Sequence, residues 1–382
     1  MSERIYLDYN ATSVVRPEAE AAMVAALRLG GNASSVHAAG RAARAMVEEA
    51  REAVAALAGA RPQDVVFTSG GSEANTLAIT SAVQAGGRRL IVGATEHASV
   101  LDTAAASGAA VELWPVDSNG VADLGWLADR LKHWTAGDGR PFVAVMAANN
   151  ETGVIQPVAQ AAAMLHAAGG LLHVDAVQAA GKMNLSLSTL GADTLALSAH
   201  KLGGPQGVGA LAFAPAAPIH RRLHGGGQER GLRAGTENLA GIAGFGAAAA
   251  AALRDLPHLA DQAAWRDATA ARLKAAGARV AGEDAPRLDA ILCIAVEAWP
   301  SALQVMALDL DGVMVSAGSA CSSGKVRPSG VLTAMGFGER AVGALRASGG
   351  WATTEDDWRR FADAWLAAHE RHASRVRARE YA

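Results

Sequence analysis

The chain has 382 residues, 51% of them hydrophobic, and 34 Lys and Arg against 37 Asp and Glu give a net charge of −3 at pH 7. This balance excludes a global field that would attract nucleic acid or anionic lipid, and no apolar run approaches the roughly 20 residues of a membrane span. Two cysteines, Cys293 and Cys321, are too few for a disulfide framework. The first residues lead into Ile5-Tyr6-Leu7 without a signal segment, so we expect a cytoplasmic protein.

The first eighty residues predict two helices before the first buried strand. A short extended segment over residues 5–10 precedes a helix that begins at Pro17 and ends at Gly30-Gly31. An apolar stripe between residues 42 and 57 predicts a long amphipathic helix. Residues 65–68 are typical of a strand, and a Gly-rich turn then leads into a helix near Glu73.

Strands and helices alternate over the following residues. Apolar runs typical of strands occur at residues 90–92, 111–114, 142–147, 171–174, 194–197 and 208–213, and helical patterns occur near residues 124–131 and 158–168. This alternation predicts an α/β fold in which helices cover both faces of a mostly parallel sheet.

The pattern changes near Pro257 to longer helices and fewer strands. We therefore place a large domain at residues 1–256 and a smaller C-terminal α/β domain at residues 257–382, with residues 1–15 packing on the smaller domain. Strands of the smaller domain are expected at residues 288–296 and 313–315. Its last helix is expected to begin at Thr353-Thr354-Glu355-Asp356, an N-cap followed by acidic residues.

Polar residues follow four of the predicted strands at the ends where parallel strands place a ligand. His97 follows residues 90–92, Asn150 follows 142–147, Asp175 and Gln178 follow 171–174, and Lys201 follows 194–197. Strands commonly end in polar loops, so each end alone is weak evidence. Four such ends together predict one shared site.

Lys201, flanked by Ser198 and His200, suggests the chemistry of this site. A lysine at the mouth of a sheet is costly to desolvate, so it pairs with an anion or loses its proton. A neutral lysine amine attacks carbonyls such as the aldehyde of pyridoxal phosphate (PLP). A solvated loop lysine is the alternative interpretation.

The other residues match what PLP requires. Backbone N–H groups at Gly70-Gly71-Ser72, before the helix at Glu73, suit the phosphate. Asp175 is the candidate carboxylate for the pyridine nitrogen. His97 can stack on the ring and move protons. We therefore expect PLP as the cofactor.

Three competing sites fit the sequence less well. The Gly-rich turn has no GxGxxG pattern for a dinucleotide. The segment from Gly318 to Gly324-Lys325 has one residue too many for a P-loop, and Val326 replaces the Ser or Thr that holds magnesium. His220 and His224 have i, i+4 spacing but no HExxH motif or cysteine cluster. We expect these two histidines on a surface turn and no metal site.

The two cysteines differ in their surroundings. Cys293, within Ile291-Leu292-Cys293-Ile294, fits a buried small apolar residue. Cys321 has small, polar and flexible neighbours, which is what a nucleophile on a moving loop requires.

With these residues in place, the sequence resembles the cysteine desulfurases, PLP enzymes of fold type I in the class V aminotransferase group. The resemblance runs over nearly the whole chain and rests on eight motifs: Tyr6-Leu7-Asp8-Tyr9-Asn10-Ala11-Thr12, Phe67-Thr68-Ser69-Gly70-Gly71-Ser72-Glu73, Thr95-Glu96-His97, Asn149-Asn150-Glu151-Thr152-Gly153, His173-Val174-Asp175-Ala176-Val177-Gln178, Ser198-Ala199-His200-Lys201, Arg233-Ala234-Gly235-Thr236 and Gly318-Ser319-Ala320-Cys321-Ser322-Ser323-Gly324.

The resemblance implies a role for each matching residue. Lys201 would hold PLP as a Schiff base, with Asp175 at its pyridinium nitrogen, and Gln178 and Asn150 would contact the ring hydroxyl and substrate. The phosphate would lie among residues Gly71, Ser72, Ser198 and His200, and Thr236 would reach the phosphate of the partner subunit in a homodimer. Arg346 would clamp the carboxylate of L-cysteine. Cys321 would take the substrate sulfur as a persulfide, leaving alanine.

The Ser-rich loop around Cys321 resembles the long-loop group, which implies delivery of sulfur to an iron–sulfur scaffold or a sulfur-carrier protein. Two alternatives stay open: a selenocysteine lyase, and a weakened subunit that serves as a docking partner. The chain departs from the family at Ala33, Asp289-Ala290 and Gly349, around the pocket rim and the smaller domain.

Overall fold

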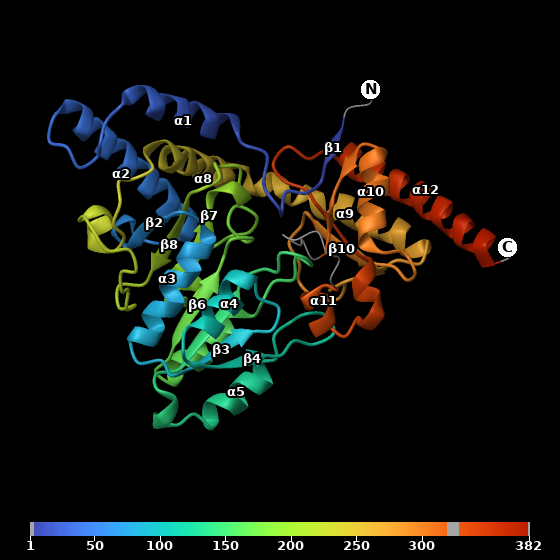
Figure 1. The fold of residues 1–382 in the computed structure, drawn as a ribbon, viewed down its shortest axis with the longest axis horizontal. Helices are drawn as coiled ribbons and strands as arrows, with labels where there is room; N and C mark the ends of the chain where they lie inside the picture. Colours follow the sequence, from blue (N-terminus) through green and yellow to red (C-terminus); the bar gives the residue numbers. More distant parts are fainter. Residues whose placement is uncertain (1–3, 319–327, 381–382) are drawn as a thin grey trace.

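The computed structural model describes residues 4–318 and 328–380 and is built around a seven-stranded sheet (Figure 1). The strand order is β2 (Val65–Thr68), β8 (Gly209–Phe213), β7 (Thr194–Ser198), β6 (Leu171–Asp175), β5 (Phe142–Met146), β3 (Arg89–Gly93) and β4 (Ala110–Trp114). Strand β8 runs antiparallel to the other six strands of this sheet, which are parallel to one another. The predicted mostly parallel sheet is confirmed, and each strand predicted for this sheet is found within one or two residues of its expected limits.

Alternating side chains of the strands point to opposite faces of this sheet. Val65 and Phe67 of β2 belong to the cluster packed with α2 (Ala38–Ala58), α6 (Val158–Ala167) and α8 (Leu239–Leu259). Val66, between them, packs with α3 (Gly71–Gln84). Helix α4 (Ala98–Ala106) lies beside α3, and α5 (Leu124–Lys132) beside α6. Both faces are therefore covered, which buries every residue of β2, β5, β6 and β7.

Helix α8 packs against α1 (Pro17–Leu29) and α2. Contrary to the expectation from sequence, it is long and apolar enough to cross a membrane by length and composition. More than half of its apolar window is nevertheless buried inside the protein, at 56%, which is typical of a core helix. Pro257 lies inside α8, so the predicted division at residues 256 and 257 falls within a helix and stays a prediction.

The C-terminal part forms a separate four-stranded antiparallel sheet, in the order β12 (Ser316–Ala317), β13 (Ala344–Ser348), β10 (Ile291–Ala295) and β9 (Arg279–Val280). It is accompanied by α9 (Asp261–Ala275), α10 (Ser301–Leu310), α11 (Gly330–Ala334) and α12 (Glu355–Glu380). The strand expected at residues 313–315 is shorter, β11 (Val313–Met314), and it does not join this sheet. It pairs instead with the N-terminal strand β1 (Ile5–Tyr6), so β1 lies beside the C-terminal part of the chain (Figure 1).

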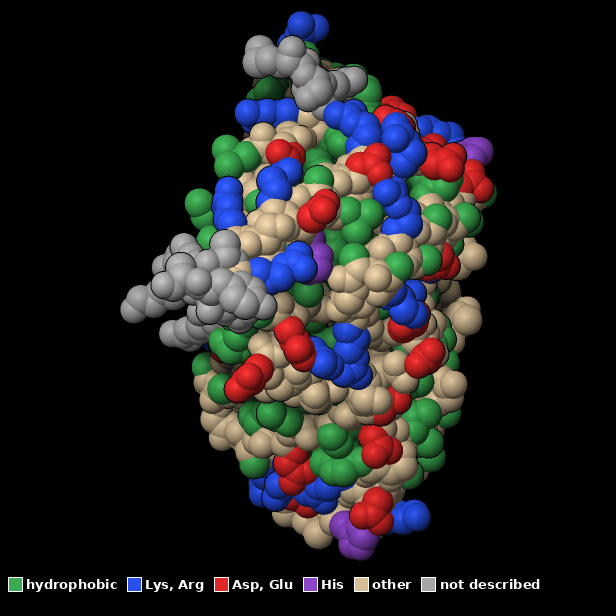
Figure 2. All heavy atoms as spheres, turned by 90° about the vertical axis from the view of Figure 1, so that its right-hand side faces the viewer, with side chains coloured by type: hydrophobic (Ala, Val, Ile, Leu, Met, Phe, Trp, Pro, Cys, Tyr) green, Lys and Arg blue, Asp and Glu red, His purple; other side chains and the backbone are tan. Residues whose placement is uncertain are grey.

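Charges of both signs are interspersed on the face formed by this C-terminal part (Figure 2). Ion pairs account for part of the pattern: Arg359 lies beside Asp356 and Asp363 on α12, and Arg371 pairs with Asp311. These groups are largely exposed, so solvent and salt screen them strongly.

One ion pair is buried and joins elements that are far apart in the sequence. The Arg51 guanidinium on α2 donates two hydrogen bonds to the Glu229 carboxylate, at 2.7 and 2.9 Å, and only 2% and 3% of the two side chains are exposed. Glu229 also accepts the backbone N–H of Phe67, at 2.9 Å. The pair therefore fixes β2 and the loop that leads to Thr236.

Arg51→Met is expected to lower the free energy of unfolding by about 3 kcal/mol, because it leaves the Glu229 carboxylate buried without its partner. Urea denaturation measures the loss. Adding Glu229→Gln should recover part of it by removing the uncompensated charge. Arg254→Met, which breaks the exposed pair of Arg254 with Glu18, is the matched control and should change stability far less. Equal losses in the two single variants would contradict the prediction.

Candidate active site

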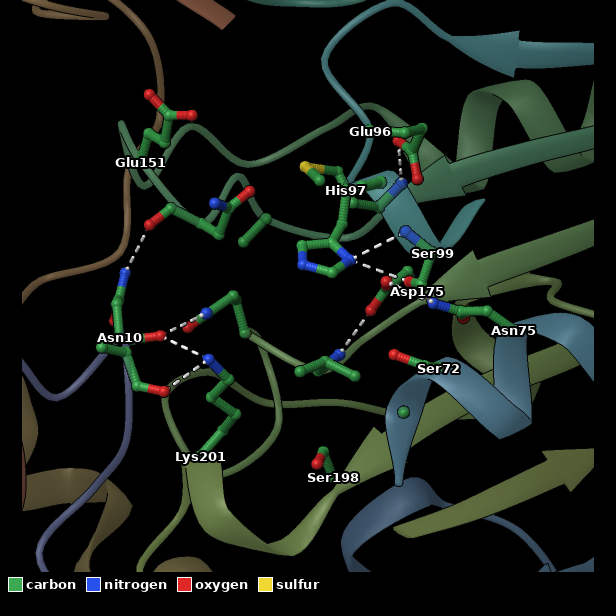
Figure 3. A pocket seen from close by; sticks show the side chains of 18 of the residues that line it. Asn10, Ser72, Asn75, Glu96, His97, Ser99, Glu151, Asp175, Ser198 and Lys201 are labelled. Atoms are coloured by element: carbon green, nitrogen blue, oxygen red, sulfur yellow. Dashed lines mark hydrogen bonds between the residues drawn. The ribbon is translucent and has the colours of Figure 1, made fainter. Parts of the chain in front are cut away.

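A cavity of about 490 Å³ lies beyond the carboxyl ends of β3, β5, β6 and β7 (Figure 3). Ten of the residues predicted for the site line it: Gly71, Ser72, His97, Asn150, Asp175, Gln178, Ser198, His200, Lys201 and Arg346. Thr236 does not line it, and Cys321 lies outside the described residues. The structure thus brings together side chains spread over almost 280 residues of sequence.

Lys201 is the last residue of a short 3₁₀ turn, Ala199–Lys201, that follows β7. Its Nζ donates to the backbone oxygens of Asn10 and Ala11, at 2.5 and 2.9 Å. Burial, and then the positive charge of Arg346, lower the pKa of the Lys201 amine to about 8. An amine with this pKa is about one tenth neutral at pH 7 and half neutral at pH 8.

Covalent attachment of PLP to the apoprotein should therefore accelerate about fivefold between pH 7 and pH 8 and level off above that. An amine with an ordinary pKa would continue to gain rate up to about pH 10. Stopped-flow absorbance measures the rate, and borohydride followed by peptide mapping locates the modified residue. Modification of Lys182 or Lys325 instead of Lys201 would overturn the assignment.

Lys182 lies near Lys201 but makes different hydrogen bonds. Its Nζ donates to Asn10 Oδ1 at 2.7 Å and to Gln178 Oε1 at 2.8 Å. Because Gln178 Oε1 accepts from Lys182, its Nε2 is free to donate, and it reaches the Asn10 backbone oxygen at 3.0 Å. Lys182 does not line the cavity, so Lys201 is the amine available there.

Asp175 is the last residue of β6, and two donors fix its carboxylate. Val177 N–H donates to Oδ1 at 3.0 Å, and Asn75 Nδ2 donates to Oδ2 at 2.8 Å. Glu96 lies nearby, fully buried, with Oε1 accepting the Met146 N–H at 2.6 Å. Burial, and then the charge of Asp175, raise the pKa of Glu96 well above its usual value. The burial of Glu96 beside Asp175 thus favours the protonated form of Glu96.

The first turn of α3 forms the anion-binding end of the site. The first N–H groups of a helix have no intrahelical acceptor and favour negative charge. Gly71 suits this position, since a Cβ there would lie 2.6 Å from Val177 Cγ2 and would force that side chain to move. Gly71, Ser72, Ser198 and His200 also line an adjoining cavity of about 470 Å³. These four residues therefore surround the helix N-terminus, as the resemblance implied.

His97 is exposed and sits at the N-cap of α4, with its ring against the cavity (Figure 3). Its side chain lines the cavity, where a planar ligand would lie. Asn150, by contrast, contributes its backbone oxygen to the described contacts, which accepts from Asn10 Nδ2 and Arg346 Nη1, both at 3.0 Å.

Arg346 projects from β13 of the C-terminal sheet and is 2% exposed. Besides its bond to the Asn150 oxygen, its Nη2 donates to Asp8 Oδ1 at 2.8 Å. Among the residues that the structure describes, Arg346 Nε has no hydrogen-bond partner. A buried guanidinium with an unused N–H group is prepared to receive a further acceptor such as a carboxylate.

Glu151 lies where two described residues that flank Cys321 in the sequence, Gly318 and Ser329, meet the cavity. Ser329, after Cys321, donates its hydroxyl to Glu151 Oε2 at 2.6 Å. Gly318, before Cys321, lies against the same carboxylate, since a Cβ there would be 3.3 Å from Oε2. Burial raises the pKa of Glu151 to about 7. Residues on both sides of Cys321 therefore meet at one residue of the cavity.

The remaining predicted features lie elsewhere. Thr236 is exposed and lines a separate cavity of about 230 Å³ with Ser69 and Gly207. His220 and His224 are exposed outside helices and strands. No group of metal-ligating side chains occurs within residues 4–318 and 328–380. Cys293 is fully buried in β10, which confirms the prediction of a buried small apolar residue, and burial raises the pKa of its thiol.

The residues of the cavity fit PLP. The helix N-terminus offers N–H groups to a phosphate, the fixed carboxylate of Asp175 faces the interior, and Lys201 provides a buried amine with a lowered pKa. Asn10, Asn75, Glu96, Ser99 and Glu151 also line the cavity and were not predicted. Asn75 was detectable, because it stands three residues after Ser72 and hence on the same face of the helix.

Comparison with known proteins agrees with this geometry. Residues 5–361 match the family model "Aminotransferase class-V", and the chain belongs to this family. A curated relative from Cereibacter sphaeroides, named "Cysteine desulfurase", is 41% identical over 93% of both chains. The resemblance to cysteine desulfurases and the predicted fold class are thereby confirmed.

Solved structures of related proteins share the fold of this chain. The NifS-like protein from Rickettsia africae superposes with a TM-score of 0.88 at 28% identity, over 96% of this chain and 100% of that one. A structure described as SspA in complex with cysteine gives a TM-score of 0.76 at 27% identity, over 90% and 98% of the two chains. The similarity thus spans both sheets.

Proposed function

We propose that this protein is a PLP-dependent L-cysteine desulfurase. The observation that carries the proposal is one cavity that holds the buried Lys201 amine, the fixed Asp175 carboxylate and the unused N–H of Arg346. Together these groups suit an amino acid bound beside an aldehyde cofactor. The family membership and the cysteine-bound SspA structure support cysteine as the substrate.

In the proposed reaction the C–S bond of L-cysteine breaks and an S–S bond forms at Cys321. The products are L-alanine and a Cys321 persulfide. The Cys321 sulfur contributes the electron pair of the new S–S bond, the electron pair of the broken C–S bond stays on the carbon, and that carbon takes up one proton released from a thiol while the other proton stays with the persulfide. Each of the two sulfurs thereby loses one electron and the carbon gains two. No external oxidant or reductant is required.

The residues of the cavity have different roles in the proposed reaction. Gly71, Ser72, Ser198 and His200 would hold the PLP phosphate, and Asp175 the ring nitrogen. Bound PLP supplies an aldehyde for amines and an electron-withdrawing ring that stabilises negative charge on the adjacent carbon. Lys201 and His97 hold and move protons beside the substrate. Arg346 orients the substrate through its carboxylate.

Arg346→Lys is expected to raise KM for L-cysteine by about 10- to 100-fold, because an ammonium keeps the charge but loses the planar fork. Steady-state kinetics of alanine formation measures the change. Arg340→Lys is the matched control, since Arg340 pairs with Glu297 on the surface and should leave KM unchanged. Cysteamine lacks the carboxylate. If the unmutated enzyme turned over cysteamine as efficiently as cysteine, Arg346 would not be the residue that binds the substrate carboxylate.

The function itself is tested on the purified PLP-loaded protein with L-cysteine and, separately, L-selenocysteine. The desulfurase predicts equal amounts of alanine and sulfide from cysteine when a thiol reductant is present. Turnover of selenocysteine alone would establish the selenocysteine lyase instead. Failure with both substrates would favour a docking subunit.

We further propose a cytoplasmic homodimer in which Thr236 reaches the phosphate site of the partner subunit. Thr236 is exposed and does not line the active-site cavity of its own chain, which supports this arrangement. The sulfur acceptor would be an iron–sulfur scaffold or a sulfur-carrier protein. Light scattering tests the dimer, and transfer of labelled sulfur from Cys321 to a candidate acceptor tests the delivery.

A further inference from the structure

We propose that Ser99, held by Asn75, is a positioning residue that confines the proton of the neutral His97 ring to Nε2. The inference rests on the proposed function, because it specifies which atom of His97 exchanges protons at the site. A neutral imidazole has one N–H donor and one acceptor nitrogen, and the hydrogen-bond network determines which is which.

The backbone N–H of Ser99 determines whether His97 Nδ1 carries a proton. The N–H of Ser99 donates to this nitrogen at 3.1 Å. A backbone N–H cannot act as an acceptor, so Nδ1 must offer its lone pair and carries no proton in this geometry. The Ser99 hydroxyl lies 2.9 Å from the same nitrogen. Figure 3 shows both contacts on one side of the ring, with the other nitrogen facing the cavity.

Asn75 determines the direction of the Ser99 hydroxyl. Its Nδ2 donates to Ser99 Oγ at 2.9 Å and to Asp175 Oδ2 at 2.8 Å. Because Ser99 Oγ receives this hydrogen bond, its own O–H is available to donate to His97 Nδ1. Two donors from one residue therefore converge on Nδ1, and the ring proton is held at Nε2.

The orientation of the Asn75 amide is itself fixed. Its Oδ1 lies 2.9 Å from His173 Nε2, and His173 Nδ1 lies 2.9 Å from Thr194 Oγ1. Burial lowers the pKa of His173 to about 3, so this ring is neutral and has a single N–H. Because Asn75 Nδ2 donates to the Asp175 carboxylate, Asn75 Oδ1 is the atom that faces His173 Nε2, and an amide oxygen only accepts, so the N–H of His173 is at Nε2. A flipped amide would turn its oxygen toward the Asp175 carboxylate. Asn75, only 1% exposed, thus couples Asp175 to His97.

The consequence is that His97 acts through one nitrogen. Nδ1 is occupied by Ser99, and Nε2 is the atom that faces the cavity. A ring with its proton at Nε2 is ready to donate there, and it becomes an acceptor at Nε2 only after that proton has left. The neutral form of His97 is therefore a proton donor at Nε2 and not an acceptor there.

The tautomer is measured directly on the PLP-loaded protein labelled with ¹³C,¹⁵N-histidine. Ring ¹⁵N shifts and two-bond couplings identify the protonated nitrogen, and His97→Gln assigns the resonance. We expect the Nε2–H form in the parent and in Ser99→Thr, which keeps the hydroxyl. Ser99→Ala should give a mixture of tautomers and lower kcat about three- to tenfold with KM little changed, the effect of one lost hydrogen bond.

Two further variants complete the test. Thr103→Ala is the matched control, because it removes a hydroxyl contact between the same helices, Thr76 to Thr103 at 3.2 Å, and should change neither the tautomer nor kcat. Asn75→Asp should shift the tautomer as Ser99→Ala does, since its carboxylate would draw the Ser99 hydroxyl proton away from His97. An Nδ1–H ring in the parent, or an unchanged tautomer in both Ser99→Ala and Asn75→Asp, would overturn the inference. The NMR measurement needs no substrate, so it stands apart from any failure of the proposed activity.

Discussion

Asp175→Asn is expected to lower kcat for alanine formation by about a thousandfold, which corresponds to about 4 kcal/mol. The substitution keeps the volume but removes the charge that would hold a proton on the ring nitrogen of PLP. It also disturbs the local hydrogen bonds. Val177 N–H and Asn75 Nδ2 both donate to the carboxylate, and an amide has one oxygen, so one of these donors would face the new NH₂ group.

Absorbance of the bound cofactor and the rate of alanine formation measure the effect together, because PLP retention should fall with kcat. Asp193→Asn is the matched control. Asp193 precedes β7, at the opposite end of the same sheet, and its carboxylate accepts the Leu172 N–H at 2.7 Å. This variant should keep full activity. An Asp175→Asn protein with normal PLP content and turnover would exclude Asp175 as the partner of the PLP ring nitrogen.

The large sheet could be predicted from sequence because its strands are short apolar runs separated by polar loops. The C-terminal sheet was harder for a physical reason. Its strand β13, Ala344–Ser348, contains a buried arginine and two alanines, and alanine has a low strand propensity. Its place is decided by pairing with β10, in which Arg346 lies opposite Cys293. Such pairing depends on the fold and has no local signal.

The same limit applies to the site. Residues at the ends of parallel strands were predicted, since strand direction alone brings them together. Asn10 and Glu151 were not predicted to serve the cavity, because their positions depend on how the N-terminal segment and the Asn149–Gly153 loop meet the C-terminal part. Ser99 was missed because its contact depends on the N-cap geometry of α4.

Two departures from the family pattern are neighbours in the structure. The N–H of Gly349 donates to the Ala290 oxygen at 2.8 Å. A Cβ at Gly349 would lie 2.2 Å from Gln262 Oε1, and Gln262 is itself buried and bonded to the Gly350 oxygen at 2.8 Å. Glycine at position 349 therefore makes room for Gln262. The departures form one packing arrangement beside β10 and β13, away from the cavity lining.

Cys321→Ala is expected to lower kcat for alanine and sulfide formation from L-cysteine by at least about a thousandfold, as loss of a nucleophile does. Cys321 itself lies outside the described residues. The structural support is that Gly318 and Ser329, on either side of its segment, both meet Glu151 at the cavity. Binding of cysteine depends on Arg346 and Lys201, so the change in PLP absorbance on adding cysteine should persist.

Cys293→Ala is the matched control and should retain activity, because burial raises the pKa of the Cys293 thiol and no solvent reaches it. Full activity of Cys321→Ala with L-cysteine would contradict the desulfurase mechanism and favour the selenocysteine lyase. Selenocysteine provides the remaining comparison, since selenium leaves more readily without a protein nucleophile. We expect Cys321→Ala to cleave selenocysteine while failing with cysteine, which would place the thiol in the sulfur-transfer step and leave substrate binding to the cavity.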